Sequence, residues 1–356
     1  MTKAKLITAG ILVVGMLLAT MPSTWGAYLE QDHEKARPRE PERVIPPPPP
    51  PRNEIGELIS RVRVSGPFTF KNVTVFPLRL SAPSVYSDYK TLDESLSRGY
   101  IEILEEKSPD VRSVLVRNNS PYTIFLMAGE SLAGGKQNRL ISEDVLLAPH
   151  GRPVRIPVYC IERGRWSPAE RELASGGFAA PSSMRRMARE KVSQTALWDA
   201  VSGLLEETGS RSENEDLRAA FENDSVREEL GRFRREFRIP FRETVGCVVV
   251  VHGRIAGSDL FSSPELSRKL WHKVLDSYVM DAIPLSKRHG LWPGPPSVEE
   301  VRRFLDTVFR ASFRERGGRD LGRIVEIAGS GIEGEGLVHR GDAVHVHLTP
   351  RRETRF

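Results

Sequence analysis

The segment from residue 129 to residue 139 holds the side chains whose types and spacing point most clearly to chemistry. It reads GESLAGGKQNR, so three glycines are followed at once by four polar or charged residues. The main-chain N–H groups of a glycine-rich loop can surround an anion, and Lys136 and Arg139 would add two positive charges. Glu130 stands at the start of the segment as a candidate acid–base group, with the two cations available to stabilise negative charge.

This segment nearly matches the phosphate-binding loop of nucleotide hydrolases, G-x-x-x-x-G-K-[ST]. The spacing from Gly129 to Gly134 fits, but an extra glycine displaces the lysine, and Gln137 stands where a magnesium-binding hydroxyl is needed. The residues from Leu140 onward are expected to form a strand, whereas a phosphate-binding loop leads into a helix. We therefore expect no nucleotide. The alternative to a ligand site is a β-bulge or wide turn in which Gln137 and Asn138 satisfy buried backbone groups.

Residues 160–166, CIERGRW, form a second segment with reactive side chains. Cys160 ends an apolar strand, and Glu162 points to the same face because side chains alternate along a strand. Glu162 is a second acid–base candidate, and Arg165 is a second candidate ligand for an anion. The thiol has three interpretations: a nucleophile, which lacks a histidine nearby in the sequence; a buried core residue, which is favoured; or a disulfide partner of Cys247, which an exported protein can form.

Two histidines near the C-terminus are candidate metal ligands. His345 and His347 share one face of the last strand, and Val344, Val346 and Leu348 share the other. The apolar face is expected to be buried, so the histidines are expected to face solvent. Zinc takes three or four protein ligands, and no third ligand is placed beside this pair. We expect neither a metal site nor a cofactor.

The elements that must position these residues read mainly as strands in the N-terminal half of the folded region. A β-branched run at 111–117, a turn at 118–121 and an apolar run at 122–127 together predict a β-hairpin. Thr91 and Glu94 form a capping box that predicts one short helix before it. Further strand patterns cover residues 145–148 and 154–161.

The C-terminal half changes to a helical period and then mixes helices with strands. Residues 184–238 are predicted to be helical, with capping boxes at Ser212/Glu215 and Ser225/Glu228. The elements that follow are a buried strand at 245–251, capped helices beginning near Ser263 and Ser297, and strands within 322–349. This order of strands, helices and strands favours an α+β fold over a doubly wound parallel sheet.

The first 55 residues are expected to lie outside this domain. Residues 1–27 place two lysines before an uncharged run, which is the layout of a signal peptide or of an uncleaved N-terminal anchor. Residues 28–55 contain six consecutive prolines and predict an extended linker. We therefore expect an exported protein, either periplasmic, extracellular or anchored to the outer face of the cytoplasmic membrane. Its folded part, residues 56–350, is expected to be one α+β domain, with a division near residue 180 as the alternative.

Composition and charge exclude several classes of protein. The 356 residues carry 52 Lys+Arg against 47 Asp+Glu, and a net charge of +5 is too dilute for nucleic-acid binding without a local cluster. Two cysteines exclude a disulfide-rich scaffold. A multi-pass membrane protein is excluded as well, so contact with a membrane is expected only through the N-terminal segment.

Four blocks occur in the order found in one known family: residues 91–96, residues 129–139, residues 160–166, and Gln194 with Trp198 on the following helix. Over roughly residues 60–283 the chain resembles the ARG and rhodanese-phosphatase-superfamily-associated protein domain, a prokaryotic family without an established activity. The second block is the most specific, although it has two adjacent glycines where family members often have a glycine and an alanine. The resemblance implies a shared fold and a shared site built from these blocks, and it implies no substrate.

The polar blocks fall in loops or at strand ends, where a rigid scaffold holds functional side chains. We expect them to converge in an extracytoplasmic binding module that holds a polar, anionic ligand or a peptide strand. The alternative is a hydrolase or transferase with Glu130 or Glu162 as the acid–base group and with Lys136 and Arg139 stabilising anionic charge. The candidate site residues are Glu130, Lys136, Gln137, Asn138, Arg139, Glu162, Arg165 and Gln194.

Overall fold

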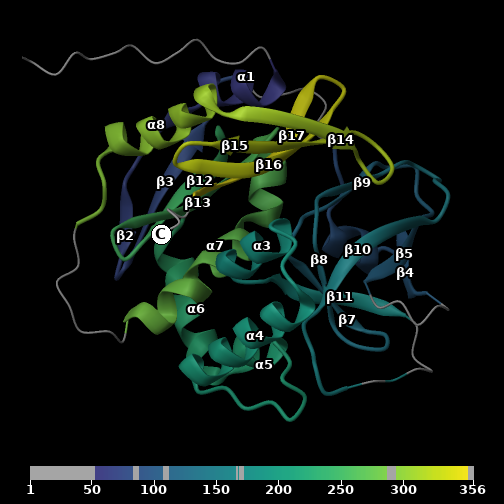
Figure 1. Cartoon of the computed structure of the whole chain (residues 1–356). Helices are drawn as coiled ribbons and strands as arrows, with labels where there is room; N and C mark the ends of the chain where they lie inside the picture. The colour runs from purple at the N-terminus through teal and green to yellow at the C-terminus, as the bar shows by residue number, and fades with distance from the viewer. Residues whose placement is uncertain are drawn as a thin grey trace, which may run out of the picture. The chain divides into compact units, whose positions relative to one another are not determined.

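The structure is a computed structural model that describes residues 53–82, 88–106, 112–165, 167, 172–286 and 294–351. By their contacts, these residues belong to one compact unit. They form an α+β fold with two large antiparallel sheets, a two-stranded sheet and covering helices (Figure 1). The predicted signal peptide or anchor lies outside the described residues, as does the linker up to residue 52.

The first helix of the described part of the chain begins at Glu54, before the predicted domain boundary at residue 56, and the side chain of Asn53 caps it. None of the helices in the described residues combines the length and the apolar composition that crossing a membrane requires. Their bounds are α1 (Glu54–Arg61), α2 (Leu92–Ser97), α3 (Ser182–Arg189), α4 (Gln194–Thr208), α5 (Arg218–Glu222), α6 (Asp224–Glu236), α7 (Pro264–Ser286), α8 (Val298–Asp306) and the 3-10 helix η1 (Thr307–Arg310).

The larger sheet has nine strands in the described residues, and its neighbouring strands are antiparallel. Its strand at residues 244–251 is buried along its whole length, as the β-branched run predicts. The strands in order are β1 (Arg63–Val64), β3 (Val73–Arg79), β12 (Thr244–Val251), β13 (Arg254–Phe261), β17 (Asp342–Pro350), β16 (Ile332–His339), β15 (Arg323–Gly329) and β14 (Ser312–Gly317), with β2 (Phe68–Phe70) beside β3.

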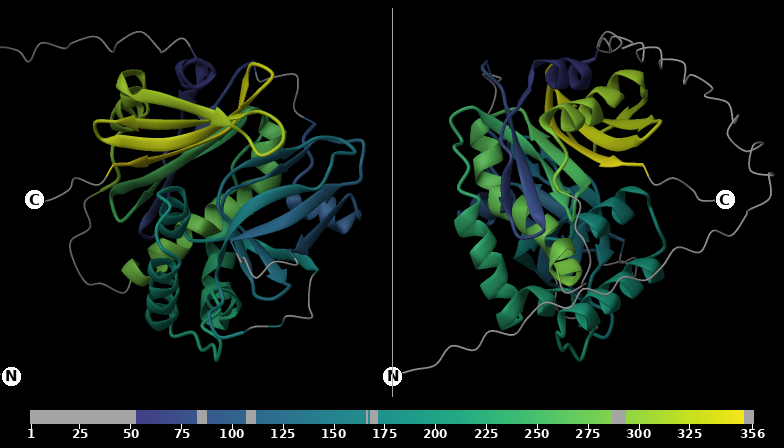
Figure 2. Two further views of the ribbon diagram at one scale, coloured as in Figure 1. Left: turned by 45° about the vertical axis from the view of Figure 1, so that its right-hand side comes forward. Right: turned by 90° about the vertical axis from the view of Figure 1, so that its left-hand side faces the viewer.

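Helices cover both faces of this larger sheet. On one face, α1 and α8 pack against apolar side chains that include Val248 and Val346. On the other face, α7 packs against β12 and β13 and contacts the alternate side chains, among them Val249. Figure 2 shows α1 and α8 together along the sheet. Because both faces are covered, a side chain on either face of a central strand is buried.

The smaller sheet has six strands in the described residues, and a separate pair of short strands lies outside it. The six strands in order are β11 (Leu173–Ala179), β7 (Glu130–Gly134), β8 (Arg139–Ile141), β10 (Val154–Cys160), β5 (Ser113–Asn118) and β4 (Ile101–Glu105). The separate pair is β6 (Ile124–Leu126) with β9 (Val145–Leu147).

The predicted hairpin over residues 111–127 is wrong. β5 pairs with β4 and β10, whereas β6 pairs with β9. The Asn118 side chain donates to the main-chain oxygens of Tyr122 (2.7 Å) and Ala148 (2.8 Å). These bonds hold the turn in a form that directs the chain away from β5, so the two apolar runs enter different sheets.

The predicted helix starts are confirmed only in part. The capping boxes at Thr91 and Ser297 are present, and the segment 184–238 is largely helical. The predicted cap at Ser225 is wrong, because the side chain of Asn223 accepts the Ser225 N–H and caps α6. The predicted cap at Ser212 begins no helix, since the next helix, α5, starts later in the chain.

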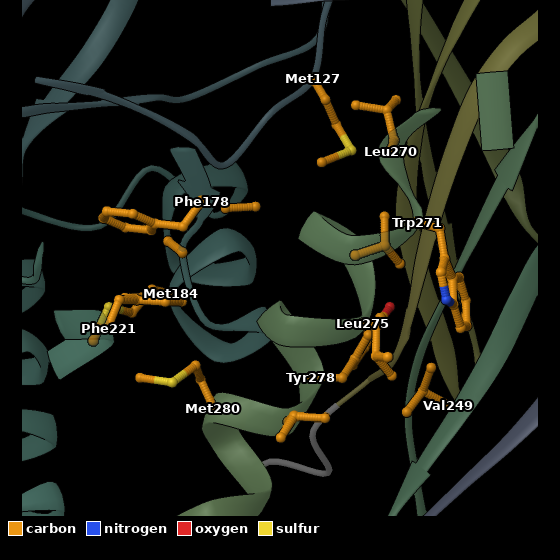
Figure 3. Close-up of a cluster of buried hydrophobic side chains, with 14 of the residues drawn as sticks. Met127, Phe178, Met184, Phe221, Val249, Leu270, Trp271, Leu275, Tyr278 and Met280 are labelled. Atoms are coloured by element: carbon orange, nitrogen blue, oxygen red, sulfur yellow. The ribbon is translucent and has the colours of Figure 1, made fainter. Parts of the chain in front are cut away.

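The main core gathers around α7. Figure 3 shows side chains of this helix, including Leu275 and Tyr278, facing Val249 of the larger sheet on one side. Met280 of α7 points to the other side, where Met184 of α3 and Phe178 of β11 lie. This buried helix therefore connects the larger sheet, the smaller sheet and the helical segment in one core.

Candidate functional site

The glycine-rich segment contains β7 and its connection to β8. Leu140 and Ile141 belong to strand β8, as predicted. Gly134 and Gly135 have φ values of +102° and +57°, which glycine adopts without steric cost. A Cβ atom on Gly135 would lie 2.9 Å from the side chain of Glu105. The connection is therefore packed against β4.

Arg139 is fully buried and joins three strands. Its guanidinium donates to Oε1 of Glu105 at 2.7 Å, to Sγ of Cys160 at 3.0 Å and to Oε1 of Gln137 at 3.2 Å. A buried charge is tolerated only when it is paired and hydrogen-bonded, and Glu105, also fully buried, supplies the opposite charge. Arg139 thus fastens β8 to β4 and β10.

Glu162 is the second centre of this network. Its carboxylate accepts the Asn138 N–H at 3.0 Å and Nε of Arg165 at 2.9 Å. Nε2 of Gln137 donates to the main-chain oxygen of Glu162 at 2.9 Å, and Nδ2 of Asn138 donates to Oδ2 of Asp216 at 2.8 Å. The amide side chains therefore satisfy buried groups of the turn, as the wide-turn alternative predicts.

Two further predicted residues join the same network. Nζ of Lys136 donates to the main-chain oxygen of Glu106 at 2.9 Å. Gln194, the first residue of α4, accepts the Cys160 N–H at 2.9 Å and donates to the Cys160 oxygen at 2.8 Å. We call this set the hairpin network; its predicted members are Lys136, Gln137, Asn138, Arg139, Glu162, Arg165 and Gln194.

Glu130 lies apart from the hairpin network. Its Oε1 accepts Nζ of Lys273 at 2.7 Å, and its Oε2 accepts the Met127 N–H at 2.8 Å. Lys273 also donates to Asp93 at 2.7 Å. Burial raises the pKa of Glu130, and the charge of Lys273 opposes this shift. Glu130 therefore ties β7 to α7, and the structure does not bring it together with the other seven residues.

The two cysteines are free, buried thiols in the described structure. Burial raises the pKa of both thiols, which disfavours the nucleophilic thiolate. Cys160 contacts Arg139, as described above, and Cys247 lies in the central strand β12. The core interpretation of Cys160 fits this placement.

The predicted exposure of His345 and His347 is wrong. The two side chains belong to residues that are 0% and 7% exposed. Val346 and Leu348 are buried under α1 and α8, as predicted, whereas Val344 packs in the core around α7. The opposite face of β17 is covered as well, by α3 and by the loop before β9. The prediction failed because it assumed a sheet with one solvated face.

His345 is the centre of a buried charge network between the two sheets. Its Nδ1 lies 2.6 Å from Asp144 and its Nε2 lies 3.0 Å from Asp259. Arg185 and the Tyr278 hydroxyl also donate to Asp259. Burial lowers the pKa of His345, but the two aspartates outweigh burial and raise it to about 9, so the imidazolium form is favoured. Within the described residues, no three His, Cys, Asp or Glu side chains are arranged to hold a metal ion.

A cavity of about 510 Å³ lies where β10 of the smaller sheet approaches β14 and β16 of the larger one. The end of α3 and the start of α4 complete its walls, and these elements can be followed in Figure 1. Its volume is within the range of small-molecule sites. We call it the inter-sheet cavity. Its charged lining in the described residues consists of Arg112, Arg189, Lys191, Arg316 and Arg319, opposed by Glu143 and Glu335.

Arg316 lies between the two carboxylates of this cavity. Its Nη2 is 2.8 Å from Glu143 and 3.2 Å from Glu335. On another wall, Nη2 of Arg189 donates to Glu333 at 3.1 Å and to Thr349 at 2.8 Å. The Nη1 of Arg189 is buried and has no hydrogen-bond partner within the part of the chain that is described. Such a buried donor is costly to leave unpaired, and an anion would satisfy it.

The start of α4 adds partial positive charge to the same cavity. Ser193 caps this 15-residue helix, and both Ser193 and Gln194 line the cavity. The first N–H groups of a helix carry the positive end of its dipole. The two bonds from Gln194 to Cys160 fix this helix end against β10. Gln194, a predicted site residue, therefore links the hairpin network to the cavity.

Glu335 is a cavity group whose protonation changes near neutral pH. Burial and the charge of Asp144 raise its pKa, Arg316 opposes them, and the result is a pKa of about 7. A carboxyl group in a concave site with a pKa in this range can exchange protons with a ligand or with solvent.

A larger cavity of about 1040 Å³ lies beside α5, α6 and β11. Its lining holds three arginines against four carboxylates, and Arg234 is already paired with the buried Asp276. It offers no excess of positive charge toward an anion, so the inter-sheet cavity is the better candidate for an anionic ligand.

Most residues of the inter-sheet cavity have no signal in the local sequence. Arg112, Arg189, Arg316 and Glu335 come from separate elements and have no shared local motif. Within single helices and strands, positive and negative residues are mixed, which is the pattern of a solvent-exposed face. The one available signal was Gln194 at the start of a capped helix.

Comparison with known proteins gives a family and no named relative. No curated protein and no solved structure matches the chain. The model of the ARG and Rhodanese-Phosphatase-superfamily-associated Protein domain matches residues 61–349, further toward the C-terminus than the resemblance over 60–283. The chain belongs to this family.

Proposed function

We propose that this protein is an extracytoplasmic binding module for a small anionic ligand, which it holds in the inter-sheet cavity. The observation that carries the proposal is the lining of that cavity, with five cationic side chains against two carboxylates. Glu326 and Glu333, which pair with Lys191 and Arg189, are not among the lining residues, so the lining itself carries the positive excess.

The hairpin network serves this function as a support. Its charged groups are bonded to one another, and of its predicted members only Gln194 lines the inter-sheet cavity. Arg139 and Glu162 hold the β7–β8 connection against β10, and β10 forms one wall of the cavity. We therefore place the ligand in the cavity rather than on the residues 129–139 and 160–166.

A titration tests this proposal directly. The full-length protein is titrated calorimetrically at pH 6 with sulfate, phosphate, pyrophosphate and ethane-1,2-disulfonate. At least one of these anions is expected to bind, and Arg316→Gln is expected to weaken it by about tenfold or more, because a charged hydrogen bond is worth about 1.5–3 kcal/mol. The matched control is Arg117→Gln, an exposed arginine on the smaller sheet. Absence of binding, or equal binding by Arg316→Gln, contradicts the proposal.

A second candidate function is an acid–base enzyme that acts on the anion. Glu130 and Glu162 are each held by a cation and a main-chain N–H, whereas Glu335 lines the cavity beside Arg316. We therefore assign the acid–base role of this candidate to Glu335. Incubation of the wild type with an anion captured from its source should yield a product that Glu335→Gln does not form. An unchanged anion in both samples contradicts the enzymatic version.

Export is proposed from the N-terminal sequence. Residues 1–27 are the expected signal peptide or anchor, and residues 28–55 are the expected spacer, so the partner is a small anion or a protein outside the cytoplasm rather than a nucleic acid. A reporter that is active only after export, fused behind residue 55, should be active. An inactive reporter contradicts export.

A further inference from the structure

Glu335 occupies the middle of a row of titratable side chains across three strands. It is in register with Glu326 of β15 and with His347 of β17. Directly opposed residues on antiparallel strands place their side chains on the same face of the sheet, so the three side chains are neighbours. The Glu335 side chain is 13% exposed and lines the inter-sheet cavity.

Arg316 is shared among acidic groups. Besides the contacts with Glu143 and Glu335, its Nε lies 3.6 Å from Glu326. A ligand anion that binds Arg316 must compete with these carboxylates. Glu143 is also held by Arg319, whereas Glu335 has its closest cation in Arg316. Of the two carboxylates that line the cavity, Glu335 is therefore the one that an incoming anion displaces more readily.

The charges around Glu335 make displacement of its carboxylate costly unless it is protonated. His347 is favoured in its neutral form, since burial and the charge of Arg185 lower its pKa. A new negative charge in the cavity would repel the Glu335 carboxylate and stabilise its neutral form. The groups that face Glu335 are Arg316 from β14, Glu326 from β15, His347 from β17, Arg189 from α3, and Glu143 and Asp144 from the loop before β9.

We propose that Glu335 couples anion binding in the inter-sheet cavity to the uptake of one proton. The anion takes the place of the Glu335 carboxylate on Arg316, and Glu335 accepts a proton from solvent as its negative charge is displaced. No covalent bond forms or breaks other than the O–H bond of the carboxyl group. This inference rests on the proposed function, and it identifies anions as ligands that bind best in mildly acidic surroundings.

The pH dependence follows from linkage. Free Glu335 changes protonation near pH 7, and bound anion shifts this change to higher pH. Affinity should be nearly constant below about pH 6, where the carboxyl group is largely neutral. Above pH 7 the dissociation constant should rise by up to about tenfold per pH unit, because one proton must be taken up for each anion bound.

The experiment uses ethane-1,2-disulfonate, whose own charge is constant between pH 5 and pH 9. The full-length protein is titrated at pH 7.5 in two buffers of different ionisation enthalpy, and the difference between the apparent enthalpies gives the protons taken up. The wild type should take up protons, and Glu335→Gln should take up none. At pH 8.5, Glu335→Gln should bind about tenfold or more tightly than the wild type. Glu102→Gln, an exposed glutamate on β4, is the matched control and should behave as the wild type.

The outcomes separate the two proposals. Binding without proton uptake, or uptake that persists in Glu335→Gln, overturns the role of Glu335 and leaves the binding function standing. Absence of disulfonate and sulfate binding at pH 6 overturns the binding function, and the role of Glu335 falls with it. Thermal unfolding of Glu335→Gln is measured alongside, and the near-isosteric amide is expected to leave the fold intact.

Discussion

The hairpin network and the inter-sheet cavity are both rich in charge, but they use it differently. In the hairpin network the cations and carboxylates bond to each other, and Arg139 and Glu105 are completely buried. In the cavity the cations are paired as well, but they line open volume and outnumber the carboxylates beside them. Charges that pair inside a packed interior stabilise a fold, whereas paired charges that line a cavity can also be reached by a ligand.

The largest effect is expected in the hairpin network. Arg139→Met leaves Glu105 buried without its counter-charge, and breaking a buried ion pair in this way costs about 3–5 kcal/mol of stability. Urea unfolding measures the change, and Arg117→Met on the exposed face is expected to stay within about 0.5 kcal/mol of the wild type. The double variant Arg139→Met/Glu105→Gln should recover part of the loss. Unfolding of Arg139→Met at the wild-type urea concentration would show that Arg139 has no supporting role.

A somewhat smaller effect is expected at His345, and it depends on pH. The pKa of His345 is raised to about 9 in the folded protein, above its usual value, so its stabilising contribution is complete below about pH 6.5 and is lost as pH rises through 9. His345→Gln should therefore lower the free energy of unfolding by an amount of the order of 3 kcal/mol at pH 6 and by much less at pH 10. The measurement is urea unfolding of both proteins at the two pH values. A loss that is equal at both contradicts the charged state of His345.

An intermediate effect is expected where the two regions meet. Gln194→Ala removes two hydrogen bonds to the main chain of Cys160, which should cost about 1–2 kcal/mol of stability. Because these bonds fix the start of α4 at the cavity, anion affinity should fall as well, by about threefold to tenfold. Calorimetric titration with ethane-1,2-disulfonate and urea unfolding measure the two quantities. Loss of stability with unchanged affinity would show that the hairpin network does not support anion binding in the cavity.

The smallest effect on stability is expected at the mouth of the cavity. The Lys191 side chain is 71% exposed and 3.8 Å from Glu326, and surface ion pairs contribute about 0–1 kcal/mol. Lys191→Gln should leave unfolding unchanged and should weaken anion binding by about twofold at low salt, with the difference disappearing at high salt. Titrations at two salt concentrations measure this. A loss of stability without a loss of affinity would show that Lys191 stabilises the fold and does not attract the anion.

Local patterns predicted the elements better than they predicted the pairing between them. The capping boxes at Thr91 and Ser297 and the apolar run of β12 mark their elements, because caps and periodicity act within a few residues. The partners of β5 and β6 are set by strands distant in sequence, so the predicted hairpin failed. The burial of His345 depends on the covering of the second face of the larger sheet, which no local pattern reports.

The candidate site shows the same limit. The resemblance and the clustered polar residues located the hairpin network, whose predicted members, apart from Gln194, lie within about 30 residues of one another in the sequence. The inter-sheet cavity draws Arg112, Arg189, Arg316 and Glu335 from across the chain. Each of these residues alone has the sequence context of a solvated charge, and only their shared cavity distinguishes them.

The most direct test of this distinction is anomalous diffraction from crystals of the wild type and of Arg316→Gln soaked in selenate, an anion that resembles sulfate. Selenium density is expected in the inter-sheet cavity, beside Arg316 and Arg189, and is expected to be lost in the variant. Density at the connection between β7 and β8, or density in the cavity that is unchanged by Arg316→Gln, would contradict the assignment of the two regions.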